Sequence, residues 1–279
     1  MLSYLHAYHA GNIADVQKHA ALSLTLSMMQ AKPSAIACFD THAGRGLYDL
    51  QDERARKTAE ADSGIQQIWA VRDTLVSDDW QHFLQPLEAL NRGGAGLRYY
   101  PGSPRWFCHW KRAQDALTLF ELHGNENDQL HRKVPLPDVR IRHEDGLKGL
   151  LRSLPPAAPR LLVLMDPSYE IRSDYADTAR TLARAWRQCR HGVYLVWYPI
   201  LLDGGHQVLL DLVSEGQAGP VIRHELRLQS PPERGMIGSG MLVLNPPWQW
   251  QHRLEAMLAP VCGADILAST QQWDWLVPE

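Results

Sequence analysis

Short strand-like runs recur along the chain and alternate with helix-favouring segments. The runs lie at residues 35–40, 116–122, 139–143, 161–166, 193–198, 221–228 and 241–245. The run 161–166 is apolar up to its last residue, which is typical of a central strand buried on both faces. Segment 12–30 carries Val16, Ala20 and Leu24 at helical spacing and is expected to form a helix. The alternation predicts an α/β fold with a mostly parallel sheet and helices on both faces.

The interval from 50 to about 101 interrupts this alternation with charged, helix-favouring sequence and a cluster of glycines. In a plain dinucleotide fold the acidic residue ending the second strand follows the glycine loop by about 20 residues. Here the candidate, Glu121, comes far later. We therefore expect a single domain over 1–279 with a helical insertion at about 50–101. Ser103 and Pro104 should begin the next helix, as N-cap and first helical residue.

Composition places the chain among globular proteins. Hydrophobic residues make up 45% and charged residues 21% of 279, both ordinary values. A membrane span is not expected, because no run approaches the roughly 18 apolar residues that one needs. The N-terminus is polar and rich in histidine, unlike a secretory signal. The cysteines are scattered without a close pair, which favours reduced thiols in the cytoplasm (Cys38, Cys108, Cys189 and Cys262).

The net charge of −3 argues against a protein that is basic all over and binds nucleic acid non-specifically. The segment 98–133 nevertheless mixes arginines and lysines with tyrosines, tryptophans and a phenylalanine. Such a surface could bind a phosphate backbone. It could equally be a solvated helix face backed by packed aromatic residues, and the sequence leaves both readings open.

Residues 40–46, D-T-H-A-G-R-G, fit a glycine loop that follows a strand. Gly44 and Gly46 would let the backbone approach a ligand closely, and a helix starting after them would offer free N–H groups. The third glycine of the dinucleotide pattern is replaced by Asp49, whose charge would repel a pyrophosphate. The loop therefore favours S-adenosylmethionine (SAM) over NAD, with Gly44 at the cofactor, although a lone G-x-G can also be a simple tight turn.

Acidic residues stand at the ends of the next two strands. Glu121 is placed to accept hydrogen bonds from ribose hydroxyls. Glu144, Asp145 and Gly146 follow the next strand, where an adenine ring would lie. Each carboxylate alone could be a solvated strand end, but their recurrence in order favours a nucleoside ligand.

The turn Asp166-Pro167-Ser168-Tyr169 is the catalytic candidate. An exocyclic adenine amine is a poor nucleophile, because its lone pair is delocalised into the ring. The Asp166 carboxylate and the Pro167 carbonyl could accept the two amine hydrogens and localise that lone pair, while proline fixes the turn. Tyr169 could stack on a flipped base, an interaction worth roughly 1–3 kcal/mol. The alternative is an aspartate that merely caps a turn.

A second turn, N-P-P-W at 245–248, matches the amino-methyltransferase pattern [DNS]-P-P-[FYW] more closely. It follows a strand near the C-terminus, after the acidic residues expected to bind the nucleoside and at the expected margin of the sheet. We interpret it as a structural turn or a wall on the RNA side, and assign the chemistry to Asp166.

The N-terminal segment is dense in histidine and tyrosine. His6, His9 and His19 are candidate metal ligands, but no acidic or cysteine ligand accompanies them at zinc spacing. We expect instead an arm that grips substrate, with Lys18 facing either phosphate or cofactor.

Together these residues resemble the RlmJ family of bacterial 23S ribosomal RNA adenine-N6 methyltransferases. The match runs in collinear order from Y-x-H-x-Y-H-A-G-N-x-A-D-V-x-K-H through D-T-H-A-G-x-G, Y-P-G-S-P, E-L-H, E-D-G and D-P-S-Y-E to G-S-G-M and N-P-P-W. Each motif is weak alone, whereas their order over almost the whole chain is specific.

The resemblance implies a Rossmann-like class I SAM-dependent methyltransferase fold with a small helical insertion, and no metal. Asp166 would be the catalytic acceptor, and Tyr4 would touch the RNA with His6 and Lys18 close by. The residues placed at the cofactor are His19, His42, Ser103, Glu121, Asp145, Gly146 and Asp166. The implied partner is 23S ribosomal RNA, naked or in an early assembly particle, with a monomer favoured. The sequence does not determine the target nucleotide.

Two departures from the family pattern matter. Ser168 stands where the family usually has a second proline, which should loosen the turn but leaves the Pro167 carbonyl in place. Leu5 stands where a basic residue is common, which removes one possible phosphate contact. The alternatives are a DNA adenine methyltransferase, a non-catalytic RNA-binding relative, and an NAD-dependent oxidoreductase.

Overall fold

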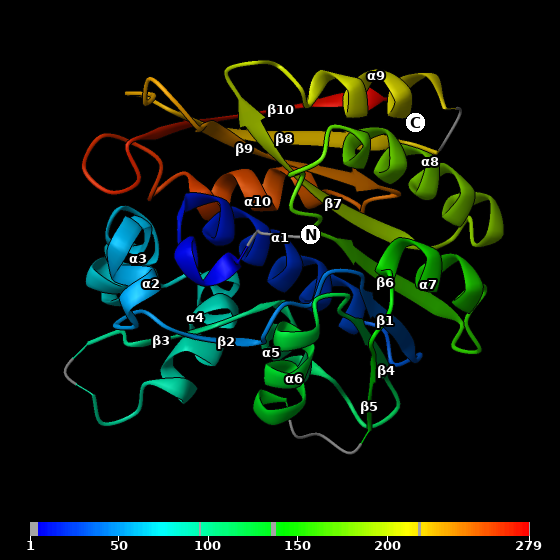
Figure 1. The fold of residues 1–279 in the computed structure, drawn as a ribbon, viewed down its shortest axis with the longest axis horizontal. Helices are drawn as coiled ribbons and strands as arrows, with labels where there is room; N and C mark the ends of the chain where they lie inside the picture. The colour runs from blue at the N-terminus through cyan, green and yellow to red at the C-terminus, as the bar shows by residue number, and fades with distance from the viewer. Residues whose placement is uncertain (1–4, 95, 135–137, 217–218, 279) are drawn as a thin grey trace.

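An eight-stranded mixed sheet runs through the computed structural model, which describes residues 5–94, 96–134, 138–216 and 219–278 (Figure 1). In spatial order the strands are β10 (Ser269–Val277), β8 (Val221–Leu228), β9 (Met236–Leu244), β7 (Val193–Leu201), β6 (Arg160–Met165), β1 (Ile36–Asp40), β4 (Ala116–Phe120) and β5 (Val139–Arg142). A separate antiparallel pair joins β2 (Leu47–Asp49) to β3 (Tyr99–Pro101). The predicted α/β fold is confirmed.

The parallel half of the sheet has the order β5-β4-β1-β6-β7. The chain therefore builds outward from β1 in one direction and then, starting with β6, in the other. The loops after β1 and β6 diverge at this switch point, which leaves a crevice at the carboxyl ends of the strands. Both candidate motifs, the glycine loop and the Asp166 turn, follow these two strands.

The remaining strands are antiparallel to their neighbours. β9 lies between β7 and β8 and runs opposite to both, and β10 runs opposite to β8 at the edge of the sheet. The sequence did not lead us to expect β10. It alternates exposed polar residues such as Thr270, Gln272 and Asp274 with partly buried ones, a pattern of an edge strand and not of an apolar run.

Helices cover both faces of the sheet (Figure 1). Their bounds are α1 (Ile13–Gln30), α2 (Glu53–Thr58), α3 (Ile65–Val71), α4 (Asp78–Leu90), α5 (Ser103–Trp110), α6 (Gly124–Lys133), α7 (Gly146–Ser153), α8 (Ser173–Gln188), α9 (Gln207–Glu215) and α10 (Trp250–Leu258), with 3-10 turns η1 (His6–Tyr8), η2 (Glu60–Ser63) and η3 (Arg72–Thr74). Residues of α1, α4, α5 and α10 share one apolar core with the sheet, and residues of α7, α8 and α9 share another.

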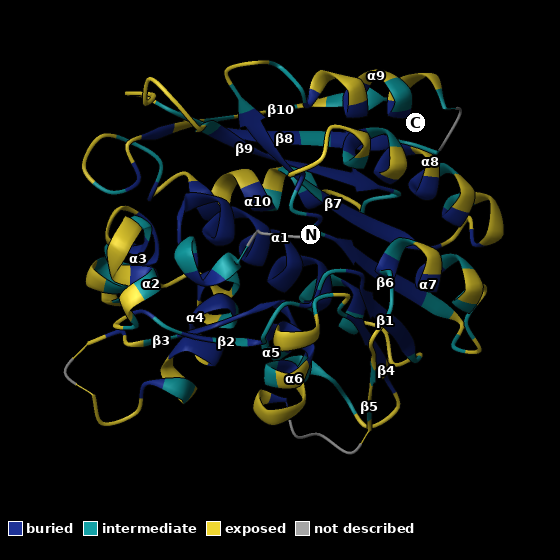
Figure 2. Ribbon diagram, in the orientation of Figure 1, coloured by how far each residue is buried: buried dark blue, intermediate teal, exposed yellow. Residues whose placement is uncertain are grey.

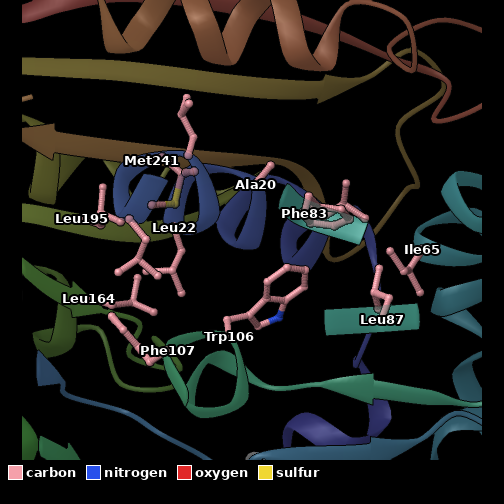
Figure 3. Packing of buried hydrophobic residues seen from close by; sticks show 14 of the residues in the cluster. Ala20, Leu22, Ile65, Phe83, Leu87, Trp106, Phe107, Leu164, Leu195 and Met241 are labelled. Atoms are coloured by element: carbon pink, nitrogen blue, oxygen red, sulfur yellow. The ribbon is translucent and has the colours of Figure 1, made fainter. Parts of the chain in front are cut away.

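Helix α1 is buried along nearly its whole length, between the sheet and the helices of its own face (Figure 2). Leu22 lies with Leu164 and Leu195 of the central strands, and Trp106 and Phe107 of α5 lie close by (Figure 3). Because the helix is buried all round, its polar residues must find partners inside the protein. This burial is what brings Asp15 and Lys18 into the candidate site.

The segment from 50 to 101 is mostly helical, with α2, α3 and α4 between β2 and β3. Its status as an insertion into a single domain stays a prediction. The start of α5 differs by one residue from expectation, because Gly102 is the N-cap and Ser103 is the first helical residue. In the described part of the chain, no helix is both long and apolar enough to span a membrane.

Candidate active site

A cavity of about 1150 Å³ opens along the carboxyl ends of the strands. The expected cofactor, catalytic and RNA residues that the structure describes all line it: His6, Lys18, His19, His42, Gly44, Ser103, Glu121, Asp145, Gly146, Asp166, Pro167 and Tyr169. Parallel strands end at one edge of a sheet, so motifs far apart in sequence meet there. Tyr4 lies outside the described residues.

Asp166 lines this cavity and is held by Lys18. Its Oδ2 is 2.6 Å from Lys18 Nζ, and its side chain remains 13% exposed. Asp15, one turn before Lys18 on α1, places Oδ1 2.9 Å from the same ammonium. His6 Nε2 lies 2.9 Å from Oδ2 of Asp15. A chain of polar contacts therefore runs from the N-terminal segment through α1 to the end of β6.

The charges of these contacting residues oppose the effect of burial on their pKa values. Burial raises the pKa of Asp166, and the nearby Lys18 ammonium limits the rise. Burial alone would raise the pKa of Asp15 as well, but His6 and Lys18 outweigh it and hold the pKa of Asp15 well below its usual range. Burial would lower the pKa of Lys18, yet the two carboxylates raise it. Lys18 therefore stays charged, and it favours the ionised form of Asp166.

The glycine loop is fixed to the end of β4 through Glu121. Gly44 adopts a positive φ of +60°, and its N–H donates to Glu121 Oε2 at 2.8 Å. His123 N donates to Oε1 of the same carboxylate at 2.7 Å. Each carboxylate oxygen keeps a second lone pair, so Glu121 can still accept from a ribose hydroxyl.

Two sequence expectations about this loop were wrong. The loop leads into the short strand β2 and not into a helix, so no helix N-terminus faces the cavity there. Asp49 forms an ion pair with Arg98 of β3 at 2.8 Å and does not line the cavity. Its charge therefore gives no reason to prefer SAM over a pyrophosphate ligand.

The loop after β5 forms the other wall at this end. Asp145 caps α7 by accepting from Lys148 N at 3.1 Å. His42 lies opposite, and burial lowers its pKa to about 4, so it is neutral near pH 7. Gly146 packs against the glycine loop so tightly that an added Cβ would lie 1.8 Å from the Thr41 carbonyl oxygen.

We therefore expect Gly146→Ala to push the two cofactor loops apart. SAM affinity should fall by at least tenfold, because a misplaced wall removes several contacts together. Titration calorimetry with SAM measures this, with circular dichroism to verify folding. Gly96→Ala is the control, because its added Cβ meets nothing within 4 Å. Equal SAM affinity in the two variants would contradict the expectation.

Asp40, which ends β1, is fully buried beneath the site. Burial raises its pKa from the ordinary value of 3.8 to about 7, with Ser103 opposing the rise. In the described chain its Oδ2 has no hydrogen-bond partner. Ionising this carboxyl inside the protein is therefore costly.

The sign of the resulting pH dependence follows from linkage. The folded state keeps this proton up to about pH 7, while the unfolded state loses it near 3.8, so stability falls as pH rises through that window. The loss is at most about 4 kcal/mol. Asp40→Asn should remove this part of the slope. Urea unfolding of both proteins from pH 4 to 8 tests it, and parallel curves would contradict it.

His19 and Ser103 line the cavity on the α1 side. His19 Nδ1 lies 2.6 Å from the Tyr100 hydroxyl, and its ring is stacked on Trp106 with centroids 5.2 Å apart. Burial holds the pKa of His19 well below its usual range, so the ring is neutral. Its Nε2 is buried and has no hydrogen-bond partner among the described residues. A buried ring nitrogen without a partner is unusual and marks His19 as a candidate for contact with a bound molecule.

Tyr169 lines the cavity but is only 7% exposed. Its backbone has a positive φ of 53°, and its ring is stacked on Tyr175 with centroids 4.4 Å apart. Its hydroxyl donates to the Trp197 carbonyl at 2.7 Å. One face of the ring is therefore already covered, and a base could use only the other.

Trp197 is a cavity residue that the sequence analysis missed. It comes from β7, is partly exposed, and places its ring 5.8 Å from Lys18 Nζ. The strand pattern predicted β7 but gave no sign that this one position faces the site.

The turn that begins at Asn245 lies at the end of the sheet opposite the cavity, and the strand before it, β9, is an interior strand and not a marginal one as expected. Leu244 pairs with Tyr194, close to the start of β7, because β9 runs antiparallel to β7. The side chain of Asn245 donates to the Gly192 carbonyl at 3.2 Å, and Trp248 is 82% exposed. The reading as a structural turn fits this position, whereas a wall beside the Asp166 site does not.

The aromatic residues of segment 98–133 are buried or partly buried, although some of its basic residues, such as Arg132 and Lys133, are exposed. Tyr100, Trp106 and Phe107 are at most 1% exposed, and Arg112 binds Asp115 and nearby carbonyls. The structure therefore supports the packed-helix reading.

The remaining N-terminal histidine, His9, lies 2.7 Å from Glu60. Among the described residues, no cluster of at least three histidine, cysteine or acidic side chains could hold a metal ion.

The chain matches a protein family described as "Ribosomal RNA large subunit methyltransferase D, RlmJ" over residues 33–277. It is 36% identical to ribosomal RNA large subunit methyltransferase J of Escherichia coli (strain K12) and 32% identical to the protein of that name from Haemophilus influenzae; each comparison covers 100% of both chains. A crystal structure of a protein from Legionella pneumophila is similar, with a TM-score of 0.87 and 31% identity over 96% of this chain and 98% of that one.

Proposed function

Because the chain belongs to the RlmJ family of ribosomal RNA large subunit methyltransferases, we propose that it transfers a methyl group from SAM to the N6 amine of one adenine in 23S ribosomal RNA. The observation that carries the proposal is the position of Asp166. Its carboxylate faces a cavity at the switch point of the sheet and is held there by a buried ammonium.

The residues at one end of the cavity fit SAM. Glu121 and Asp145 offer carboxylate oxygens for ribose and adenine, and His19, whose buried Nε2 has no partner among the described residues, is the proposed contact for a polar group of the methionyl part. Gly44 and Gly146 keep the two loops close, and His42 and Ser103 complete the wall. When bound here, SAM supplies an electrophilic methyl group on a sulfonium.

The residues around Asp166 activate the amine for methyl transfer. The Asp166 carboxylate accepts a hydrogen bond from one amine N–H and the Pro167 carbonyl accepts one from the other. The nitrogen lone pair is then localised and free to attack the methyl carbon. Lys18 orients the carboxylate and favours its ionised form. Pro167 fixes the turn, so these acceptors are in place before the base arrives, and preorganised groups of this kind lower the barrier most.

The adenine must leave its stack to reach this depth. The face of the Tyr169 ring away from Tyr175 is the proposed surface for it, with His6 and Lys18 near its sugar and phosphate. Tyr4 is proposed to touch the RNA from the N-terminal segment. Ser168 leaves the turn looser without removing an acceptor.

Methylation of RNA from cells that lack the activity tests the proposal. Naked 23S RNA and early assembly particles are incubated with tritiated SAM, and the product is mapped by nuclease digestion and mass spectrometry. We expect N6-methyladenine at one position. Transfer to duplex DNA but not to RNA would favour a DNA methyltransferase, and no transfer at all would favour a non-catalytic relative.

The proposed compartment is the cytoplasm, where ribosomal RNA is made and where the four free cysteines would stay reduced. A monomer is the proposed state, and gel filtration with light scattering measures it.

A further inference from the structure

The cavity continues past Asp166, away from the glycine loop and along the antiparallel half of the sheet. β8 ends there, and β9 and β10 begin there, because Leu228 pairs with Ser269 and Leu201 pairs with Met236. We call this part the hairpin arm; its lining includes Leu201, Leu228, Pro232, Arg234, Met236 and Leu267. The residues proposed for SAM and for methyl transfer lie elsewhere in the cavity.

The floor of the hairpin arm is apolar and partly open. Leu228 and Met236 are partly buried and pack against the core on the α1 side of the sheet. Leu267 belongs to the same core and is 2% exposed. A flat ring can rest on such an apolar surface.

The rim of the hairpin arm carries an unneutralised charge. Arg234 is exposed and, among the described residues, forms no ion pair. It stands in the β8–β9 connection, between the pair Pro231–Pro232 and Gly235, whose φ is +91°. Lys18, Lys148 and Arg180, which also line the cavity, each bind a carboxylate, whereas Arg184 of α8 lines it without an ion pair among the described residues.

An apolar floor beside an exposed guanidinium is complementary to a nucleotide, because the base can lie on the floor and the phosphate can bind the arginine. We propose that the hairpin arm binds the nucleotide next to the target adenine, with its base on Leu228 and Met236 and its phosphate at Arg234. The inference rests on the proposed function. A cavity of about 1150 Å³ exceeds the roughly 300–1,000 Å³ of ordinary small-ligand sites, so it has room for more than the cofactor.

The salt dependence of RNA binding tests the charged part. Arg234→Gln should raise the KM for a short RNA about tenfold and reduce the slope of log KM against log salt by about one. The kcat at saturating RNA and the Kd for SAM should not change. Arg187→Gln is the matched control, because Arg187 is also exposed but lies near the end of α8 and does not line the cavity.

The apolar part is tested with RNAs that lack one base beside the target adenine. Removal of the correct neighbouring base should raise the KM for the natural protein. In Met236→Ala the same removal should have a much smaller effect, because the floor is already lost.

The outcomes separate the two proposals. If the natural protein methylates RNA but Arg234→Gln behaves like Arg187→Gln in KM and in salt slope, the hairpin arm is not a nucleotide site. If the natural protein transfers no methyl group to any RNA, the proposed function fails. Anisotropy of labelled RNA, which needs no turnover, then decides whether Arg234 binds RNA at all.

Discussion

Asp166→Asn is expected to reduce methyl transfer by about 10²–10³-fold, which corresponds to roughly 3–4 kcal/mol for loss of one preorganised polar group. The substitution keeps the size of the side chain but replaces one acceptor oxygen with an amide donor, which would repel an amine hydrogen. Lys18 also loses its charged partner. Single-turnover transfer of tritium from SAM to RNA measures the chemical step directly.

Binding of SAM should change far less, within about tenfold, because Asp166 lies at the edge of the proposed cofactor end and the other contacts remain. Asn245→Ala is the matched control, since it alters the motif that resembles an amino-methyltransferase turn but lies at the end of the sheet opposite the cavity. Its transfer rate should stay near that of the natural protein. If Asn245→Ala lost more transfer activity than Asp166→Asn, the chemistry would belong to the turn at Asn245 and not to the turn at Asp166.

The sequence was sufficient to locate most of the candidate site, and the reason is geometric. Buried parallel strands are recognisable as apolar runs, and their carboxyl ends must meet at one edge of the sheet. Glu121, Asp145 and Asp166 each follow such a run, so they were placed together without any knowledge of side-chain contacts. The cavity contains all three.

Other features depend on contacts that no local pattern records. The ion pair between Lys18 and Asp166 joins residues 148 positions apart, and it exists because α1 is buried against the sheet. Trp197 faces the site because of where β7 ends relative to β6. The inference from Asp49 failed because β2 turns that side chain toward Arg98, a partner that lies 49 residues away.

The antiparallel half of the sheet was the hardest part to anticipate. β10 has a polar alternating sequence, β7 continues three residues past the expected run 193–198, and β9 begins five residues before the expected run 241–245. The hairpin arm is formed by the ends of these strands, so its existence follows from their register. A pattern of apolar runs does not contain that register.

Lys18→Met is expected to destabilise the protein by about 3–5 kcal/mol near pH 8, since breaking a buried ion pair leaves uncompensated charge. The Lys18 side chain is 5% exposed, and both of its partners, Asp15 and Asp166, are largely buried. Methionine fills a similar volume, so loss of packing contributes little. The free energy of unfolding in urea measures the effect.

The size of this effect should depend on pH in a definite direction. Without the ammonium, the pKa values of Asp15 and Asp166 rise, because burial is no longer opposed. The variant can then protonate these carboxylates in the folded state as the pH falls, so its deficit should shrink between about pH 8 and pH 5. A deficit that stays constant over this range would mean that the carboxylates are not responsible for it.

Lys148→Met provides the matched control, because Lys148 forms a pair of similar length with Asp145 but is 75% exposed. An exposed pair contributes about 0–1 kcal/mol, since water screens it. The contrast between the two lysines therefore isolates burial as the cause. The result also bears on the mechanism. If the buried pair stabilises the fold, Lys18 has two roles: it holds α1 against the sheet, and it keeps Asp166 ionised for its substrate. Equal unfolding free energies in the two variants would contradict the larger contribution of the buried pair.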